Sequence, residues 1–289
     1  MPTYNRPAFL RESLQSVLLQ TFSDFEIIIT DNSADAESEK VVAEFQDLRI
    51  RYFRNEENIG AVNNHNKALA LAIGQYIYLF SDDDIMLPDN ISDKVAVLDS
   101  NPNVGLVHSN VSLIDKNSSE IEKLHWTNLN KEWSIVRQNS LMSKKLAYQL
   151  LYHGTIFICM PAVLLRRSVL STNKIEFNNQ LKYMIDWDLF LKMSLFCDFF
   201  YIDKKLIFCR THENNETYKL SRGNFYVELM IAKLSLDSLY KEADWMYPES
   251  DFVDVVKSTM RQIKHWKSGL HSSKKIRFML HIAKRLIKK

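Results

Sequence analysis

Three consecutive carboxylates, Asp82, Asp83 and Asp84, are the side chains of this sequence best placed to do chemistry. They directly follow residues 75–80, a run of aromatic and β-branched side chains that predicts a buried strand. Three acids at one strand end repel one another, so a positive group should lie among them, and a divalent ion with oxygen ligands is the natural candidate. The alternative is a solvated acidic turn in which an Asp caps the helix expected over 88–100.

The segments around this cluster predict an α/β protein. Strand and helix alternate four times with short connections, which favours a mostly parallel sheet covered on both faces. In such sheets, ligands bind at the carboxyl ends of the strands, where the acids stand. Strands are expected at 25–30, 49–53, 75–80, 104–109, 111–115 and 199–209, and helices at 7–20, 35–45, 61–73, 88–100, 140–152, 162–170 and 186–196.

The composition is that of an ordinary globular chain: 289 residues, 46% of them hydrophobic and 25% charged, enough for one or two domains. Cys159, Cys197 and Cys209 lack metal-ligand spacing and stand in apolar surroundings, as reduced cysteines of a cytosolic protein do. The longest apolar run, 155–165, contains Pro161 and is too short to span a bilayer. We therefore expect a cytoplasmic protein.

The net charge of +2 hides a basic carboxyl-terminal end. Residues 255–289 hold 11 Lys and Arg and no acid, whereas the rest of the chain holds 26 bases against 35 acids. Within 272–289 the apolar residues fall on one helical face flanked by Lys and Arg, a pattern typical of helices that lie on anionic lipid. The alternative is a terminal helix that packs on the domain. Nucleic-acid binding is less favoured because the rest of the chain is acidic.

Short motifs in residues 1 to about 215 resemble those of the family-2 glycosyltransferases. The resemblance implies the Rossmann-like GT-A fold over 1–215, and 216–289 would be a helical carboxyl-terminal extension with the basic amphipathic tail. The matching segments are Pro2-Thr3-Tyr4-Asn5-Arg6-Pro7, residues 26–33, 58–60, Asn66, 74–77, Asp82-Asp83-Asp84 with Pro88, residues 186–192, and Arg210-Thr211-His212.

The implied activity is transfer of a sugar, with inversion, from a nucleotide-diphosphate donor to a hydroxyl of a saccharide or lipid-linked saccharide. The setting would be synthesis of bacterial surface polysaccharide or oligosaccharide, in the cytoplasm or at the inner face of the membrane. Two alternatives stay open. One is a catalytically inactive partner subunit. The other is a nucleotidyltransferase, although such an enzyme should carry a Gly- and Arg/Lys-rich phosphate loop after its first strand.

The resemblance also assigns the metal site, for Mn²⁺ or Mg²⁺. Asp83 takes the place of the last Asp of the family's Asp-x-Asp motif and would be the direct ligand. Asp82 and Asp84 would serve the donor ribose and metal-bound water, and His212 would be a further ligand. Ser81 stands where many relatives have the first Asp.

Asp186 matches the general base of the family, which would take the proton of the acceptor hydroxyl. Ile185 replaces the Glu that precedes it in relatives, so a like charge is missing and the pKa of Asp186 should be raised less. Asp188 is the rival. Two positions apart on a helix, both cannot face one proton, and we expect Asp188 to offset the charge of the helix amino terminus.

The donor pocket implied by the resemblance contains Pro2, Thr3, Asn5, Asp31 and Asn58. Many relatives carry an Arg before the residue corresponding to Asn66, whereas this chain has His65. The donor phosphates would then be met by the metal, by Lys67 or by a protonated His65.

The family also has a buried central strand of about five residues before the turn that opens this chain at Pro2. We expect that the natural product starts further upstream. Otherwise two neighbouring strands lose backbone partners in the core.

Overall fold

The computed structural model describes residues 1–121, 136, 140–152, 157–213, 215, 228–229, 231–233 and 235–236. The chain divides into two compact units. The first contains Met1–Asn179 and Ile185–Glu213, and the second contains Gln180–Met184 and Asn214–Lys289. The predicted domain boundary at 215/216 lies two residues from this division.

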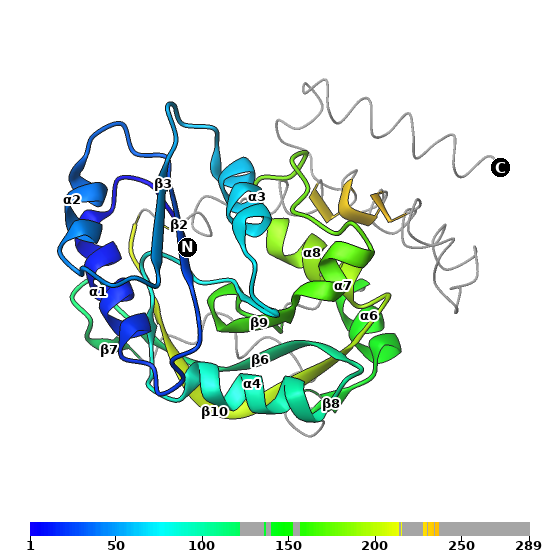
Figure 1. Ribbon diagram of the computed structural model, residues 1–289. Helices are drawn as coiled ribbons and strands as arrows, with labels where there is room; N and C mark the ends of the chain where they lie inside the picture. The colour runs from blue at the N-terminus through cyan, green and yellow to red at the C-terminus, as the bar shows by residue number, and fades with distance from the viewer. Residues whose placement is uncertain are drawn as a thin grey trace. The chain divides into compact units, whose positions relative to one another are not determined.

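The first sheet is parallel and is formed by the start of the chain. Its strands, in spatial order, are β1 (Pro2–Thr3), β2 (Ile27–Asp31) and β3 (Ile50–Arg54). All five residues of β2 are buried, as expected for a strand covered on both faces. The coverage comes from α1 (Pro7–Leu18) and α2 (Glu37–Ala43) on one side and α3 (Ala61–Leu71) on the other (Figure 1). Pro7 at the first turn of α1 has the backbone angle that a helix start needs.

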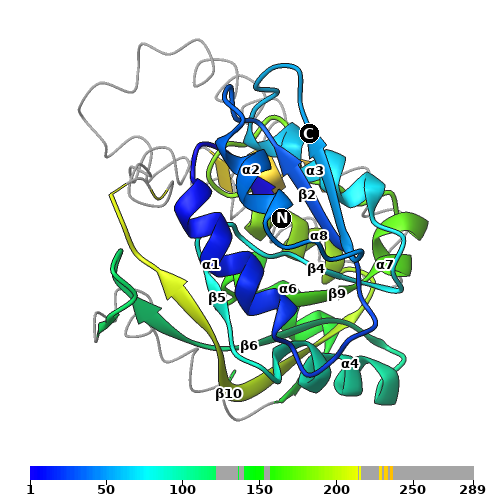
Figure 2. The ribbon, with the colours of Figure 1, turned by 60° about the vertical axis from the view of Figure 1, so that its left-hand side comes forward.

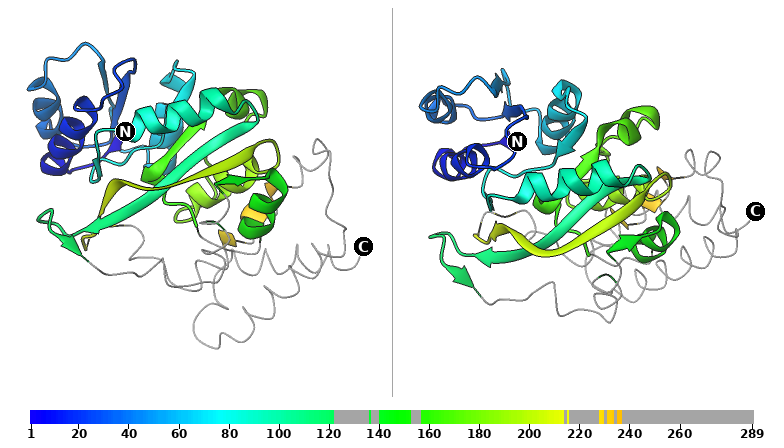
Figure 3. Two further views of the ribbon diagram at one scale, coloured as in Figure 1. Left: turned by 90° about the horizontal axis from the view of Figure 1, so that it is seen from below. Right: turned by 60° about the horizontal axis from the view of Figure 1, so that its bottom comes forward.

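The second sheet is mixed, and the segment with the three acids crosses it. The order is β4 (Tyr76–Tyr78), β9 (Val163–Arg166), β6 (Val104–Ile114), β10 (Asp198–Arg210) and β5 (Ile85–Met86), with β7 (Glu120–Ile121) paired to β6 and β8 (Leu141–Met142) to β10. The long strands β6 and β10 run parallel, side by side (Figure 3). Neighbours β4–β9, β6–β9 and β5–β10 are antiparallel. Because β4 and β5 lie at opposite edges, residues 79–84 pass from one edge to the other.

Helices pack on both sheets and fix this crossing segment. Helix α1 lies against α2 and β5 (Figure 2), and α4 (Asn90–Ser100) packs on β6, β9 and β10. Helices α6 (Lys144–Tyr152) and α8 (Ile185–Met193) pack on each other, and the short elements η1 (Met160–Ala162) and α7 (Arg167–Thr172) flank β9. A buried cluster that includes Leu10, Ile29, Phe80 and Ile207 joins α1, β2, the crossing segment and β10.

Three local predictions were wrong, each where partners distant in sequence decide the structure. Residues 162–170 were expected to be one helix, but Val163–Arg166 form β9, because the chain here inserts between β4 and β6. The strands expected at 104–109 and 111–115 are one strand, β6. The helix expected from residue 140 begins at Lys144, because Leu141–Met142 pair with β10.

A hollow of about 630 Å³ lies beside β2 and β4 in the first unit. Ile27 and Ile28 of β2 line it, as do residues 75–80 and one side of α3. Asp82, Asp83 and Asp84 do not, so this space is separate from the acidic cluster.

The second unit is described at few positions. In it, Glu228 accepts hydrogen bonds from the backbone N–H groups of Lys182, Tyr183 and Met184 at 2.8–3.1 Å. Residues 272–289 and nearly all of the extension over 216–289 lie outside the described residues. Among the residues that are described, no helix is both long and apolar enough to cross a membrane.

Candidate active site

The acidic cluster is buried and is neutralised by groups from elsewhere in the chain. Thr3 Oγ1 donates a hydrogen bond to Asp82 Oδ2 at 2.6 Å. The Arg6 guanidinium contacts both neighbouring carboxylates, at 3.2 Å from Asp82 Oδ1 and 2.8 Å from Asp83 Oδ2. Burial and the charge of Asp83 raise the pKa of Asp82 to about 6. Arg6 thus places a positive charge between the carboxylates of Asp82 and Asp83, at the position for which the sequence favours a divalent ion.

His212 contacts the same carboxylate oxygen as Arg6, which is Oδ2 of Asp83. Its Nε2 is 3.0 Å from Asp83 Oδ2, although 129 positions separate the two residues. The ring is buried and packs against the Phe9 ring of α1 at a tilt of 35°, with the centroids 5.1 Å apart. The sequence could suggest each residue separately, and the fold brings them together.

The donor set fits Mn²⁺ or Mg²⁺ bound together with a diphosphate. Asp83 offers a carboxylate oxygen and His212 offers an imidazole nitrogen. The ion pair with Arg6 shows that Asp83 accepts a positive charge at this position. No group of three His, Cys, Asp or Glu side chains that could hold a metal ion is found within the described residues. Mg²⁺ commonly binds through one or two carboxylates, with substrate phosphates and water completing its shell. The residues present suit that arrangement.

Asp84 makes structural contacts instead. Its Oδ1 accepts the backbone N–H of Arg210 at 2.7 Å, and its own carbonyl accepts the hydroxyl of Ser13 at 2.6 Å. Burial raises its pKa well above the ordinary value, and the charge of Asp83 adds to the effect. The structure thus ties Asp84 to β10 and α1.

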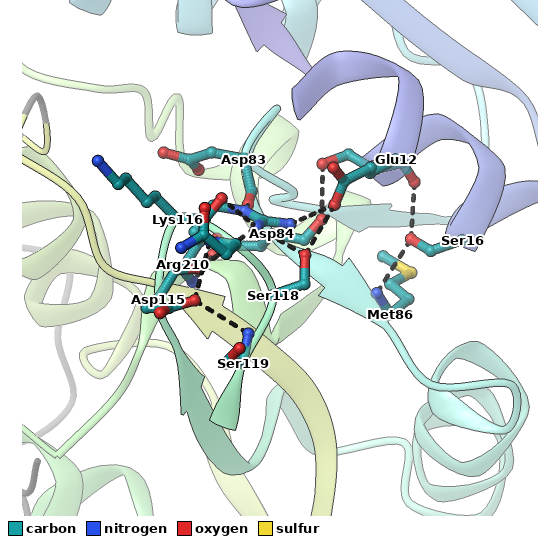
Figure 4. Close-up of polar contacts among 12 residues, drawn as sticks. Glu12, Ser16, Asp83, Asp84, Met86, Asp115, Lys116, Ser118, Ser119 and Arg210 are labelled. Atoms are coloured by element: carbon teal, nitrogen blue, oxygen red, sulfur yellow. Dashed lines mark hydrogen bonds and ion pairs between the residues drawn. The ribbon is translucent and has the colours of Figure 1, made fainter. Parts of the chain in front are cut away.

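Arg210, a residue without a predicted role, connects four segments beneath the acids (Figure 4). Its guanidinium, with no exposed surface, donates to the Asp83 carbonyl at 2.7 Å and to Glu12 Oε2 of α1 at 2.6 Å. It also donates to Ser118 Oγ at 2.9 Å, in the turn between β6 and β7. Since Arg210 lies two positions before His212, it links the backbone of Asp83 to the strand end that presents the imidazole.

Asp186 stands at the first turn of α8 with an altered acidity. Burial raises the pKa of its carboxyl to about 6, although the backbone N–H of Trp187 donates to Oδ1 at 2.8 Å. Asp188 is fully buried and pairs with Lys192 at 2.6 Å, one turn along the helix. Asp188 thus has a structural partner, whereas the raised pKa of Asp186 suits a base that works near neutral pH.

The residues predicted for the donor nucleotide lie in β1, at the end of β2, and in the turns that follow β1 and β3. Asp31 is fully buried, and it accepts the Tyr52 hydroxyl and the Ser33 N–H, each at 2.7 Å. Asn5, with a φ of 52°, bonds through its backbone N–H to Ser33 Oγ at 2.8 Å and leaves its side chain exposed. Pro2 and Thr3 form β1, and the Asn58 side chain accepts the N–H of Gly60 at 2.9 Å in the turn before α3.

His65 and Lys67, which were expected to meet the donor phosphates, have other neighbours in the structure. His65 lines the hollow and packs on Phe177, with ring centroids 5.0 Å apart. Burial lowers its pKa to about 4, so it is neutral near pH 7 and does not supply the positive charge considered for it. Lys67 donates to Asn55 Oδ1 at 2.6 Å, and the Asn55 side chain in turn donates to Asn32 and Asn64.

Sequence reasoning missed Arg6, Arg210 and Glu12. Arg6 and Arg210 both stand inside the motifs that carry the resemblance, one beside Asn5 and the other beside Thr211. The available signal for both was a basic residue within a matched motif of an acidic protein. Glu12 had none, because its partner lies 198 positions away.

Residues 1–173 match the family model described as glycosyl transferase family 2. The chain belongs to this family. The predicted fold class, GT-A, is confirmed as well: Staphylococcus aureus TarS in complex with UDP-GlcNAc aligns with a TM-score of 0.70 over 99% of this chain and 80% of that one. Sequence identity to TarS is 19%, so this likeness concerns the fold alone.

Two relatives are glycosyltransferases by name, and one of them has a named activity. An uncharacterised glycosyltransferase of Methanocaldococcus jannaschii is 31% identical over 196 residues, 66% of this chain and 62% of that protein. The Escherichia coli UDP-Glc:alpha-D-GlcNAc-diphosphoundecaprenol beta-1,3-glucosyltransferase WfgD is 31% identical over 118 residues, 41% of this chain and 46% of that protein. The matches thus span about half to three fifths of these relatives.

Proposed function

We propose that this family-2 chain is a metal-dependent, inverting glycosyltransferase. It would move a sugar from a nucleotide-diphosphate donor to a hydroxyl of a saccharide or lipid-linked saccharide during synthesis of a bacterial surface polysaccharide or oligosaccharide. The observation that carries the proposal is the convergence of Arg6 and His212 on one oxygen of Asp83. The lipid-linked acceptor is favoured by WfgD, whose name specifies a diphosphoundecaprenol substrate.

The reaction is a single displacement. Asp186 accepts the proton of the acceptor hydroxyl, the freed oxygen bonds to the anomeric carbon, and the bond from that carbon to the diphosphate breaks. Asp83 and His212 would hold Mn²⁺ or Mg²⁺, which offsets the charge of the departing diphosphate. Arg6 and Thr3 would border the diphosphate, Asp82 would serve the donor ribose or metal-bound water, and Asp31 would face the nucleoside.

The roles of the neighbouring acids differ in this proposal. Asp84 supports the loop through Arg210, and we do not assign it to the first shell of ligands. His65 is left out of phosphate binding because it is neutral and lines the hollow. Arg6 replaces it as the basic group for the phosphates.

The test of the base is Asp186→Asn, measured with the donor that the protein binds. We expect kcat to fall by about 10²- to 10⁴-fold with donor affinity unchanged, because only the proton acceptor is lost. In the unaltered protein, kcat/KM should fall about tenfold per pH unit below pH 6, since protonated Asp186 cannot accept the proton.

Asp188→Asn is the matched control. It should lower the melting temperature through loss of the buried pair with Lys192 and retain turnover in the protein that stays folded. Equal loss of turnover in both variants would contradict the assignment of the base to Asp186. Donor binding without any turnover in the unaltered protein would favour the alternative, a catalytically inactive partner subunit.

We also propose that residues 272–289 bind the membrane surface, where a lipid-linked acceptor would lie. The support is the sequence pattern, an apolar helical face flanked by Lys and Arg. Deletion of these residues should abolish sedimentation with vesicles that contain anionic lipid, and unchanged sedimentation would contradict the idea. Transfer to a water-soluble acceptor should be unaffected, which separates this proposal from the catalytic one.

A further inference from the structure

The segment that leads into α8 is an irregular one. Residues 175–184, all of them described, contain neither helix nor strand, although Leu181 and Met184 are buried. Because buried backbone N–H groups need hydrogen-bond partners, a buried loop must find them outside the regular ladders. Met184 is followed directly by Ile185, the first residue of α8, and then by Asp186, the proposed base. The partners of this segment therefore bear on the placement of the base.

A single carboxylate, that of Glu228, supplies partners immediately before α8. Its Oε1 accepts the N–H of Lys182 at 3.1 Å, and its Oε2 accepts those of Tyr183 at 2.8 Å and Met184 at 2.9 Å. Glu228 is buried and lies 44 to 46 positions further along the chain than its three partners. Hydrogen bonds to an ionised acceptor are roughly twice as strong as neutral ones, so this contact holds three successive peptide groups firmly.

The contact requires a carboxylate. Both oxygens of Glu228 are used, and one of them accepts two N–H groups. An amide side chain has only one oxygen, and its NH₂ group would face N–H donors. The other acid in the first turn of α8, Asp188, is paired with Lys192 in the same helix. Glu228 thus holds the entry into α8 through its charge and both of its oxygens.

The acidity of Asp186 depends on how this entry is placed. Burial raises the pKa of Asp186 to about 6, and the backbone N–H of Trp187 opposes this rise. If the first turn of α8 were displaced, its carboxyl would meet water, and the pKa would fall toward the ordinary value of about 4. Reaction rates are equally sensitive to position, because a displacement of about 1 Å can lower a rate by about 10²-fold.

We propose that Glu228 is a positioning residue for the proposed transfer reaction. By holding the peptide groups of residues 182–184, it fixes the entry into α8 and thereby the direction and burial of the Asp186 carboxyl. Glu228 acts through the backbone and does not itself touch the substrate. The inference rests on the function proposed above. It adds a residue that lies outside residues 1–173, the part of the chain that the family model matches.

The experiment compares Glu228→Gln with Leu229→Ala in the full chain, by NMR and without substrate. The carboxyl of Asp186 should titrate near pH 6 in the unaltered protein. Glu228→Gln should lower this midpoint by at least about one pH unit and speed amide exchange at Tyr183 and Met184 at least about tenfold. Leu229→Ala removes a buried side chain and should lower the melting temperature by about 5 °C or more while leaving both readings unchanged. Glu228→Asp, which keeps the charge but has a shorter reach, should show the changes of Glu228→Gln to a smaller degree.

Turnover is measured as release of nucleoside diphosphate from UDP-, GDP-, dTDP- and CDP-glucose in the presence of Mn²⁺. Glu228→Gln should lower kcat by about 10- to 100-fold with KM unchanged, whereas Leu229→Ala should keep kcat below its melting temperature. An unchanged titration of Asp186 in Glu228→Gln, or an equal loss of kcat in both variants, would overturn the inference. An unaltered protein without turnover would contradict the proposed function alone, because titration and amide exchange still decide whether Glu228 holds Asp186.

Discussion

The acidic crossing segment and the hollow are two parts of the same unit with opposite packing. Around Asp82–Asp84, side chains from α1, β1, the β6–β7 turn and β10 converge, and charged groups meet partners at hydrogen-bond distance. Beside β2 and β4, a lining that is more apolar than polar faces about 630 Å³ of space. Because Asp82, Asp83 and Asp84 do not line the hollow, the two regions can be perturbed by separate substitutions.

The largest expected effect comes from breaking the crowded part. Arg210→Met leaves Glu12, Ser118 and the Asp83 carbonyl without the buried guanidinium, and it should lower the free energy of unfolding by about 3–5 kcal/mol. Urea denaturation measures this loss. The control is Arg54→Met at an exposed position, which should stay within about 0.5 kcal/mol. If Arg210→Met changed the free energy of unfolding as little as Arg54→Met, the acidic cluster would not depend on the contacts of Arg210.

Adding side-chain volume should have an intermediate effect on stability, and this effect should differ between the filled core and the wall of the hollow. Ala162→Leu adds volume to a filled core position and should destabilise the protein by about 1–3 kcal/mol. Ala68→Leu adds the same volume at the wall of the hollow and should cost nothing or stabilise the protein. Thermal denaturation of both variants makes the comparison, and equal destabilisation would mean that the hollow is no more accommodating than the core.

The smallest effect concerns Arg6, whose guanidinium lies between Asp82 and Asp83. If a divalent ion binds Asp83, it competes with this half-buried cation. Arg6→Met should therefore bind Mn²⁺ about two- to fivefold more tightly when no nucleotide is present, as titration calorimetry can measure. With the donor present the same variant should bind the nucleotide more weakly, and unchanged Mn²⁺ affinity would remove Arg6 from the metal site.

The sequence predicted most of the first hundred residues because their helices and strands have a local period and short turns. The strand at Val163–Arg166 was missed, since three apolar residues fit a helix as well as a strand and only β4 and β6 decide between them. The acids and His212 could be identified as candidates from residue type. The neutral state of His65 and the contacts of Arg210 could not, because burial and partners far away in the chain determine both.

The most direct test of the donor site is a thermal-shift panel of UDP, GDP, dTDP and CDP, each with Mn²⁺ and with EDTA. A nucleotide at 100 times its Kd stabilises the folded protein by about 2.7 kcal/mol. We expect a metal-dependent rise in melting temperature for one nucleotide, which should be lost in Asp83→Ala and kept in Asp89→Ala, a change to an exposed acid. A rise that survives in Asp83→Ala, or none with any nucleotide, would contradict this expectation.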